Sequence, residues 1–214
     1  MKHLTLFFIL FIHTQLSAQT DGVTFDGYSY ENKTSTLGIG LYISQNAVTL
    51  YNDTALTDEF QSIDLFHNGE DIILYAKYHK PDYGIMNFVC IGKNERYYSI
   101  IINYSMLKYI SKVSLGHFET WEEYILNSLG VGPKHLANLE LHESQNSSSK
   151  MIESFPLESY CPVQIKGDWL ELKYSCTYKN PVIETCLSVL KCTRTAWVRW
   201  RKKGEILIGI NTIL

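Results

Sequence analysis

The sequence predicts a mainly β protein made of two small barrels with one connecting α-helix. The chain of 214 residues is rich in side chains that favour strands, with 15 Tyr, 9 Phe and 4 Trp. Short apolar runs alternate with turn residues along most of its length, which is typical of small barrels. Only one segment has the apolar period of a helix.

The first residues have the pattern of a secretory signal. Lys2 and His3 precede an apolar run from Leu4 to Ile12 that is too short to cross a bilayer, and Ala18 is a small residue at a cleavage position. We therefore predict residues 1–18 as a signal peptide and a periplasmic or secreted location. No later segment has the ~18 consecutive apolar residues of a membrane helix, so we predict no membrane insertion.

Residues 19–136 are predicted as an N-terminal β domain that ends in the helix. A polar, glycine-rich segment comes first, and the Asn68-Gly69 pair and residues 92–95 are typical of hairpin turns. The strands expected in this domain are 41–51, 60–66, 72–78, 86–91, 97–103 and 107–110.

The helix has recognisable start and stop signals. Thr120 can cap its first turn, with Glu123 three residues later as the capping-box partner. Apolar residues from Trp121 to Leu129 recur at helical spacing, and Gly130 supplies the stop.

The remaining chain is predicted as a linker and a second barrel. Residues 137–152 are mostly polar, with Gln145 to Lys150 as the clearest linker segment, and residues 153–214 form the C-terminal domain. Its expected strands are 156–162, 163–165, 169–174, 196–202 and 205–210, with Lys203-Gly204 as the last turn.

Period-two alternation predicts which side chains in this second domain face the core. Successive residues of a strand point to opposite faces, so Leu170 and Leu172 share one face and Trp169 lies on the other. By the same rule Trp200 points inward with Val198, whereas Trp197 and Arg199 point the other way.

These two strands also resemble a known family. The run Gly167-Asp168-Trp169-Leu170-Glu171-Leu172-Lys173, followed by Ala196-Trp197-Val198-Arg199-Trp200-Arg201, is similar to bacterial SH3-like (SH3b) domains, in which a G-D-W-L-x-V strand precedes a G-W-V/I-x-W strand. Ala196 stands where glycine is usual. Residues 96–102 and 107–110 resemble the same pair more distantly, and the whole chain resembles exported proteins of Bacteroidetes. The resemblance implies two SH3-like barrels that act as binding modules of the cell envelope.

We predict a ligand-binding site at Trp169, Trp197 and Arg199. An indole face can stack on a sugar or a peptide, and a guanidinium can bind a carboxylate through two hydrogen bonds. The alternative is that these aromatic residues only pack the rim of a small barrel. The basic residues between Lys191 and Lys203 indicate either contact with an anionic or phosphate-bearing partner or a solvated hairpin face.

Charge argues against a nucleic-acid partner. The chain has 19 Lys+Arg and 22 Asp+Glu, and removal of the signal takes away Lys2 and leaves a formal charge of −4. Nonspecific nucleic-acid binding needs a basic footprint instead.

The cysteines indicate a core thiol and at least one disulfide. Cys90 lies in an apolar run, whereas Cys161, Cys176, Cys186 and Cys192 lie in the last third. We expect one bridge within residues 176–192, since an exported chain meets an oxidising compartment. A zinc site is the alternative, but the spacing lacks close C-x-x-C pairs, so we predict no metal and no cofactor.

No residue set predicts catalysis. The cysteines do not open a helix beside a histidine, the histidines are scattered, and neighbouring carboxylates such as Glu122 and Glu123 diverge. The sequence therefore predicts a noncatalytic binding or adaptor protein that recognises an envelope protein, peptide or glycan. Two alternatives stay open: an inhibitor or immunity protein that blocks a toxin or wall hydrolase, and a hydrolase with an unrecognised site.

Overall fold

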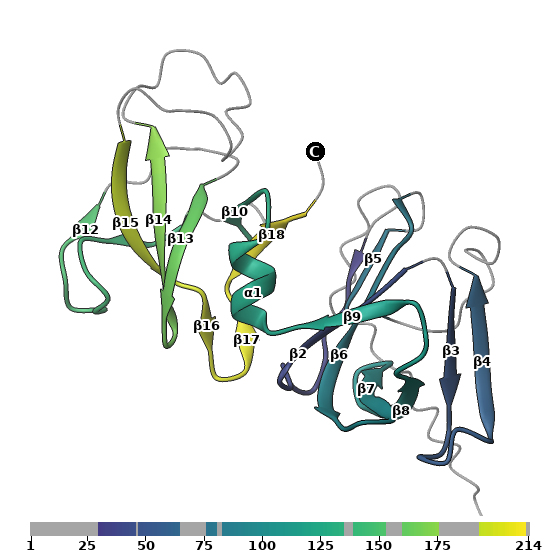
Figure 1. Ribbon diagram of the computed structural model, residues 1–214. Coiled ribbons are helices and arrows are strands. Elements are labelled where there is room, and N and C mark those ends of the chain that lie inside the picture. Colours follow the sequence, from purple (N-terminus) through teal and green to yellow (C-terminus); the bar gives the residue numbers. More distant parts are fainter. Residues whose placement is uncertain are drawn as a thin grey trace, which may run out of the picture.

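The computed structural model describes residues 30–45, 47–64, 76–80, 83–134, 139–152, 160–175 and 193–212. Over these residues the protein is mainly β with one short helix (Figure 1), which confirms the predicted class. The predicted signal peptide, the Asn68-Gly69 turn and Cys176, Cys186 and Cys192 lie outside the described residues. The described part of the chain contains no helix of a length and apolarity that could cross a membrane.

The N-terminal half forms one nine-stranded antiparallel sheet. Strand β6 is central, because β2 pairs along one of its edges and β5 and β7 pair along the other. The order runs β9-β2-β6-β7-β8-β3-β4, and β1 pairs with β5. Its strands are β1 (Tyr30–Glu31), β2 (Gly40–Ser44), β3 (Ala47–Tyr51), β4 (Glu59–Asp64), β5 (Tyr78–Lys80), β6 (Ile85–Lys93), β7 (Tyr97–Ile102), β8 (Met106–Ser111) and β9 (Gly116–Glu119).

The single strand predicted over residues 41–51 is wrong. The chain leaves the sheet at Gln45, whose backbone N–H donates to the carbonyl oxygen of Leu115 at 3.2 Å. Strand β2 pairs with β6 and β9, whereas β3 pairs with β4 and β8. The two strands therefore occupy different parts of the same sheet.

Both faces of the central strands are buried. One face, with Tyr42, Phe88 and Ile100, packs in a core that belongs to the N-terminal half alone. The opposite face carries Leu41 and Val89, which join a second core with the helix and the C-terminal half. A sheet with one solvated face would not need apolar residues on both sides.

Helix α1 (Trp121–Leu126) begins as the sequence predicts and ends earlier. Thr120 and Glu123 form a complete capping box, in which each side chain bonds the other residue's backbone N–H. The helix ends at Leu126 with Asn127 as its C-cap. It does not reach Leu129, because that residue donates its N–H to the carbonyl oxygen of Asn211 at 2.8 Å and so leads into a strand.

The C-terminal half contains three small antiparallel sheets. Five strands pair in the order β12-β11-β15-β14-β13, and two further pairs are β10-β18 and β16-β17. Lys203 and Gly204 form a two-residue turn with positive φ at both positions, as this hairpin type requires. The strands are β10 (Gly130–Pro133), β11 (Leu141–His142), β12 (Met151–Ile152), β13 (Cys161–Lys166), β14 (Trp169–Ser175), β15 (Thr193–Arg199), β16 (Arg201–Lys202), β17 (Glu205–Ile206) and β18 (Ile208–Asn211).

The segment predicted as a linker, residues 137–152, contributes two strands to this half. β11 and β12 pair with each other, and β11 also pairs with β15 through His142 and Trp197. Polar composition concealed both strands because each is two residues long and the loop between them is exposed.

Helix α1 and β10, which the sequence analysis placed with residues 19–136, are tied to the C-terminal strands. β10 pairs with β18 along one edge, and Val131 forms a bridge with Tyr160 on the other. The predicted closure into two barrels is not seen, because the sheets are open over the described residues.

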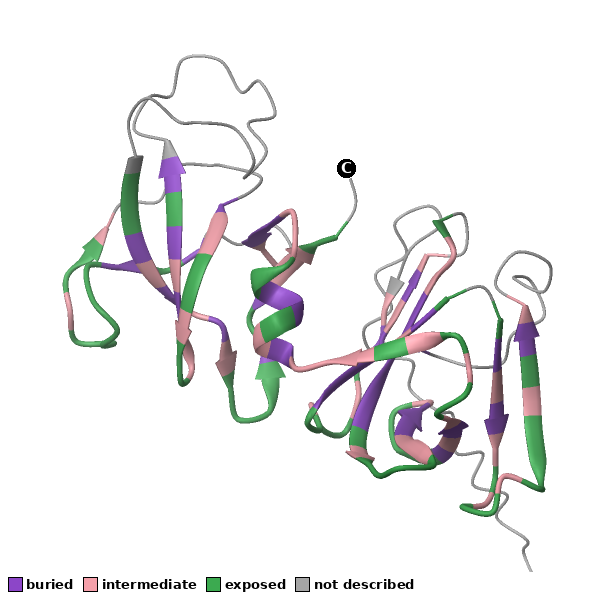
Figure 2. Ribbon diagram, in the orientation of Figure 1, coloured by how far each residue is buried: buried purple, intermediate pink, exposed green. Residues whose placement is uncertain are grey.

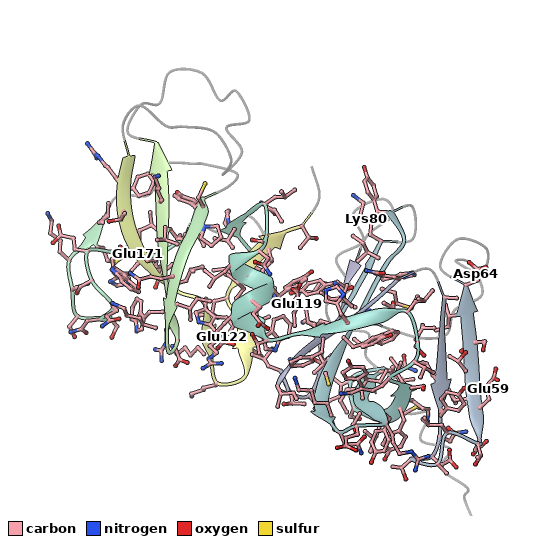
Figure 3. All side chains as sticks on the ribbon, viewed as in Figure 1. Glu59, Asp64, Lys80, Glu119, Glu122 and Glu171 are labelled. Atoms are coloured by element: carbon pink, nitrogen blue, oxygen red, sulfur yellow. The ribbon has the colours of Figure 1, made fainter. Side chains whose placement is uncertain are left out.

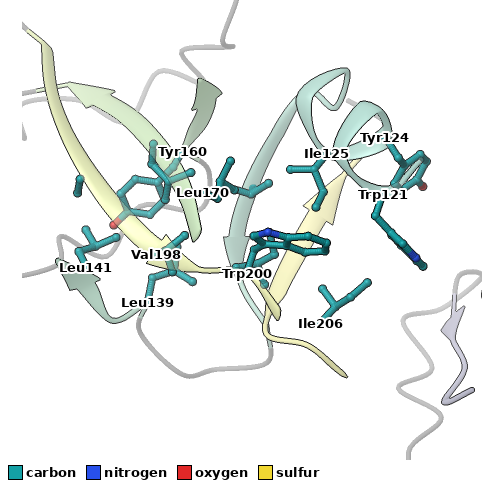
Figure 4. Close-up of a cluster of buried hydrophobic side chains, with 14 of the residues drawn as sticks. Trp121, Tyr124, Ile125, Leu139, Leu141, Tyr160, Leu170, Val198, Trp200 and Ile206 are labelled. Atoms are coloured by element: carbon teal, nitrogen blue, oxygen red, sulfur yellow. The ribbon is translucent and has the colours of Figure 1, made fainter. Parts of the chain in front are cut away.

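One continuous apolar core joins the two halves. It runs from Leu41, Val89 and Ile101 of the N-terminal sheet through Trp121 and Ile125 of α1 into the C-terminal sheets. Figure 4 shows its part around α1 and the C-terminal strands. Trp200 is fully buried at its centre, with Ile125 and Ile206 beside it in Figure 4. The indole Nε1 of Trp200 donates to the carbonyl oxygen of Gly167 at 3.0 Å, so its only polar atom is satisfied.

Candidate ligand-binding face

The outer face of the five-stranded sheet brings together the three residues predicted as a ligand site. Leu170, Leu172, Ala196, Val198 and Trp200 are all buried on the inner face. The side chains of Trp169, Trp197 and Arg199 therefore lie on the other side, where all three are partly exposed. Figure 2 shows the same alternation of buried and exposed residues along β14. The assignment of faces from the sequence is confirmed.

Strand register arranges these residues in two rows across the sheet. In the first row, Trp169 lies opposite Lys166 of β13 on one side and Arg199 of β15 on the other. Directly opposed residues of paired strands contact each other on the same face. The indole of Trp169 thus has a cationic side chain anchored on each side.

The second row runs through Trp197. It lies opposite Glu171 of β14 and His142 of β11. The buried ring of His142 meets the ring of Trp169 edge-on, with 5.3 Å between the centroids and 89° between the planes. The ammonium of Lys166 lies 5.3 Å from the centroid of the Trp197 ring. The two tryptophans therefore form the centre of one connected cluster.

Lys166 and His142 are members of this face that sequence analysis did not find. The sequence contains a pattern that could have predicted the place of Lys166, because the Gly167-Asp168 turn makes it the partner of Trp169 in a hairpin. It contains no such pattern for His142, since a two-residue strand shows no periodicity. The outer-face cluster is hereafter the set Lys166, Trp169, Glu171, Trp197, Arg199 and His142.

Arg199 is held loosely by the protein. Its Nη2 lies 3.4 Å from Oδ2 of Asp168, whereas Nε of Arg201 lies 2.8 Å from Oδ1 of the same carboxylate. The pKa of Asp168 lies below its ordinary value, chiefly because of the hydrogen bond from Arg201; burial opposes this, and the weaker hydrogen bond from Arg199 adds to the lowering. Nε of Arg199 is buried without an acceptor among the described residues. Within the described ranges Arg199 thus keeps donor capacity that no other residue uses.

Arg201 connects this network to the helix. Its Nη1 lies 3.7 Å from Oε1 of Glu122 on α1, and its guanidinium lies 4.6 Å from the centroid of the Trp200 ring. Figure 3 shows Glu122 on the helix and Glu171 on the five-stranded sheet. Arg201 is therefore a structural cation, unlike Arg199.

Glu171 supplies the negative charge of the outer-face cluster. The side-chain amide of Gln164 donates to one oxygen of Glu171. Lys173 lies on the same face of β14, two residues further along, and is exposed. The face as a whole is cationic and contains one oriented carboxylate.

A broad surface depression of about 670 Å³ opens at the far end of the same sheet. None of Trp169, Trp197 and Arg199 lines it. The lining residues are Glu143, Lys150, Met151, Ile152, Tyr174, Arg194 and Thr195.

The most strongly buried ionic group lies between the two halves of the molecule. Oε1 of Glu31 is 2.8 Å from Nζ of Lys77 and 3.0 Å from Nζ of Lys134. Burial acts to raise the pKa of Glu31, but the two ammonium groups lower it below the ordinary value of 4.5. The pKa of Lys77 is lowered, chiefly by burial. Lys134 also donates to the carbonyl oxygen of Ile206, so this buried ionic cluster ties β1 and the chain before β5 to β10 and β17.

The remaining titratable candidates are dispersed. Within the described ranges no three His, Cys, Asp or Glu side chains are grouped so that they could hold a metal ion. His79 is buried in β5, and Nε2 of the exposed His117 lies 3.2 Å from Oε1 of Glu119. His67 and His135 lie outside the described residues. Cys90 is a free, buried thiol, and Cys161 is disulfide-bonded.

The outer-face cluster combines two partly exposed indoles, two cations and one carboxylate on a rigid sheet. Indoles bind flat apolar surfaces, cations bind acid groups, and a fixed carboxylate accepts hydrogen bonds from hydroxyl or amide donors. Comparison with models of protein families, with curated proteins and with solved structures finds no match to this chain.

Proposed function

We propose that this protein is a noncatalytic, exported binding protein that recognises a ligand of the cell envelope with its outer-face cluster. The observation that supports it is the row Lys166, Trp169 and Arg199, flanked by Trp197, on a sheet face where Lys166 is exposed and the other three side chains are partly exposed. These side chains contribute little to the core, which lies on the opposite face. Sheets that present aromatic and cationic residues on a solvated face are suited to recognition.

The proposal includes an SH3-like architecture and a periplasmic or secreted location. The antiparallel run β13-β14-β15 and the change of direction at Trp200 support the first, since they place the residues that resemble SH3b strands in adjacent strands. The pattern of residues 1–18 supports the second. An envelope protein, a peptide or a glycan would each fit such a module.

Capture from an envelope fraction tests the proposal. The mature protein, immobilised, is incubated with solubilised envelope and with purified wall sacculi. Loss of an aromatic anchor typically costs about 1–3 kcal/mol, so Trp197→Ala should weaken retention roughly 5- to 150-fold with little change in melting temperature.

The chain offers a matched control for this experiment. Tyr83 is an exposed aromatic residue in the N-terminal half, and the ammonium of Lys80 lies 4.0 Å from its ring centroid. Tyr83→Ala removes a similar cation–aromatic pair away from the outer-face cluster and should leave retention unchanged. Equal losses in Tyr83→Ala and Trp197→Ala would show that the cluster is not the site.

A second candidate function, an inhibitor or immunity protein, is favoured by a different surface. Val113 and Leu115, in the loop between β8 and β9, are 90% and 62% exposed. Exposed apolar loop residues are typical of a protein-binding surface. If this function is the correct one, Val113→Asp will abolish capture of a single envelope protein and Trp197→Ala will not.

A further inference from the structure

We infer that the ligand of the outer-face cluster is an acidic glycan, a polysaccharide that carries carboxylate groups. The inference rests on the proposed function and names the chemistry of its ligand. It depends on three features of the cluster: the spacing of its cations, the unused donors of Arg199 and the position of Glu171.

The cations are spaced to bind a chain of regularly placed acid groups. Neighbouring strands lie about 4.8 Å apart, so Lys166 and Arg199, on either side of Trp169, are anchored about 10 Å apart. Lys173 adds a third exposed cation on the same face. A ligand with a single acid group would use only one of these positions.

The indoles provide the surface between the cations. Trp169 lies between Lys166 and Arg199 in the first row, and Trp197 lies diagonally beside it. The apolar face of a sugar ring can stack on an indole. Lys166, now near the ring of Trp197, is exposed and long, so it can turn to an acid group of the ligand at little cost.

Arg199 has the donors that a carboxylate requires. Among the described residues its ion pair with Asp168 is long at 3.4 Å, and Arg201 already neutralises that carboxylate at 2.8 Å. The Arg199 side chain is 39% exposed, so a ligand carboxylate can accept hydrogen bonds from its Nη groups.

Glu171 favours a glycan over other polyanions. Its carboxylate lies between the cations, opposite Trp197, and Gln164 holds it in place. A ligand composed only of acceptors, such as a polyphosphate, would be repelled there. Sugar hydroxyls donate hydrogen bonds, so a hydroxyl-rich chain with spaced carboxylates satisfies both the cations and Glu171.

Tryptophan fluorescence gives a direct test with the full mature chain. Trp121 and Trp200 are buried, so a ligand on the sheet face changes the emission of Trp169 and Trp197 alone. The probes are polygalacturonate, dextran as a neutral glycan, and poly-L-glutamate as an acidic peptide. We expect saturable quenching by polygalacturonate, with dextran and poly-L-glutamate at least ~10-fold weaker, because dextran lacks acid groups and poly-L-glutamate lacks sugar rings that can stack on the indoles.

Substitutions assign the binding to this face. Trp197→Ala and Arg199→Gln should each weaken polygalacturonate binding about 10-fold or more, as for central anchors. Lys166→Gln should weaken it and reduce its salt dependence, and as an exposed residue it carries no folding risk. The matched control is Lys202→Gln, which removes an exposed charge from β16 in the same half and should change binding less than about 2-fold.

Three results would overturn the inference. These are absence of polygalacturonate binding, equal binding of poly-L-glutamate, and equal losses in Lys202→Gln and Lys166→Gln, which would indicate nonspecific charge attraction. The envelope capture experiment distinguishes a failure of the acidic-glycan inference from a failure of the proposed function. If Trp197→Ala abolishes capture but polygalacturonate does not bind, the proposed function stands and the acidic glycan is wrong; if Trp197→Ala changes neither, both are wrong.

Discussion

Trp121 and Leu37, which are 84 residues apart, are joined by a hydrogen bond of 2.7 Å from the indole Nε1 to the backbone carbonyl oxygen. Trp121 opens helix α1, and Leu37 precedes the first long strand of the N-terminal sheet. On the same helix, Tyr124 accepts a hydrogen bond from Asn87 at 3.2 Å and stacks on Tyr78. The helix thus has specific contacts with the N-terminal sheet as well as a place in the C-terminal core, so we expect the two halves to fold as one unit.

Proteolysis provides the first prediction. A single cut between Gln145 and Lys150 falls in the exposed loop between β11 and β12, not between two independent domains. We expect the nicked protein to elute as one particle in size-exclusion chromatography, because both fragments share the core around Trp200. They should separate only in denaturant. Two fragments that elute apart under native conditions would restore residues 137–152 as a linker.

The second prediction compares Trp197 in β15 with Trp200, which directly follows this strand and points to the opposite face. Trp200 is fully buried, and truncation of a large core side chain costs about 3–5 kcal/mol, so Trp200→Ala should lower the free energy of unfolding by that amount. Trp197→Ala should cost less than about 1 kcal/mol, as is usual for partly exposed positions. Urea titration measures both. Similar losses in the two variants would mean that Trp197 is a packing residue.

The buried ionic cluster gives the third prediction. Glu31→Gln leaves Lys77 buried beside Lys134 without the carboxylate that contacts both ammonium groups, and removal of one partner of a buried pair costs about 3 kcal/mol or more. The matched control is Glu143→Gln, which removes an exposed partner 3.1 Å from Nζ of Lys150 and should cost less than about 1 kcal/mol. Thermal unfolding at pH 7 measures the loss of stability in both variants. Comparable shifts in the two variants would show that the cluster contributes nothing beyond a surface ion pair.

Acid unfolding follows from the same cluster. The folded-state pKa of Glu31 is lower than its ordinary value of 4.5, so its contribution to stability is complete above that value and is lost as the pH falls through the folded-state pKa. The wild-type protein should therefore lose stability below about pH 4.5. The free energy of unfolding of Glu31→Gln should depend less on pH in this range. Parallel pH profiles in both proteins would exclude Glu31 as the titrating group.

The fifth prediction concerns the thiol of Cys90. It is fully buried in β6 and donates a hydrogen bond to the carbonyl oxygen of Gly92 at 3.2 Å, and burial raises its pKa. We expect it to resist alkylation at pH 8 in the native protein and to react at once in denaturant. Mass mapping of unreduced peptides should also find Cys161 oxidised. A modified Cys90 in the native state would mean that β6 opens far more readily than a central strand should.

Alternation and capping account for what the sequence could predict. Leu170 and Leu172 lie on the inner face and Trp169 on the outer face, because a period of two fixes both once the strand is identified. The pair Thr120 and Glu123 marks the start of the helix through local hydrogen bonds alone. Such signals extend over a few residues, and the sequence contains them in full.

Contacts between residues far apart in the sequence explain the features that the sequence could not predict. β10 has the sequence Gly-Val-Gly-Pro, which shows no alternation, and it is a strand because β18 and Tyr160 lie on its two edges. The pairing of Glu31 with Lys134 joins residues separated by 103 positions. Trp169, Trp197 and Arg199 could be assigned to one face, but the contact of Trp169 with His142 depends on a strand too short to detect. Tertiary contacts define these elements, and one sequence does not reveal them.

The double burial of β6 also bears on how the chain reaches its native state during synthesis. Phe88 and its neighbour Val89 face opposite cores, and only the core of Phe88 can form before α1 and the C-terminal strands have left the ribosome. Until then Leu41, Val89 and Ile101 form an uncovered apolar strip that other nascent chains can bind. We expect chains truncated before β13 to aggregate or to remain bound to a chaperone, because the strands from β13 onward protect a surface made by strands that are synthesised earlier.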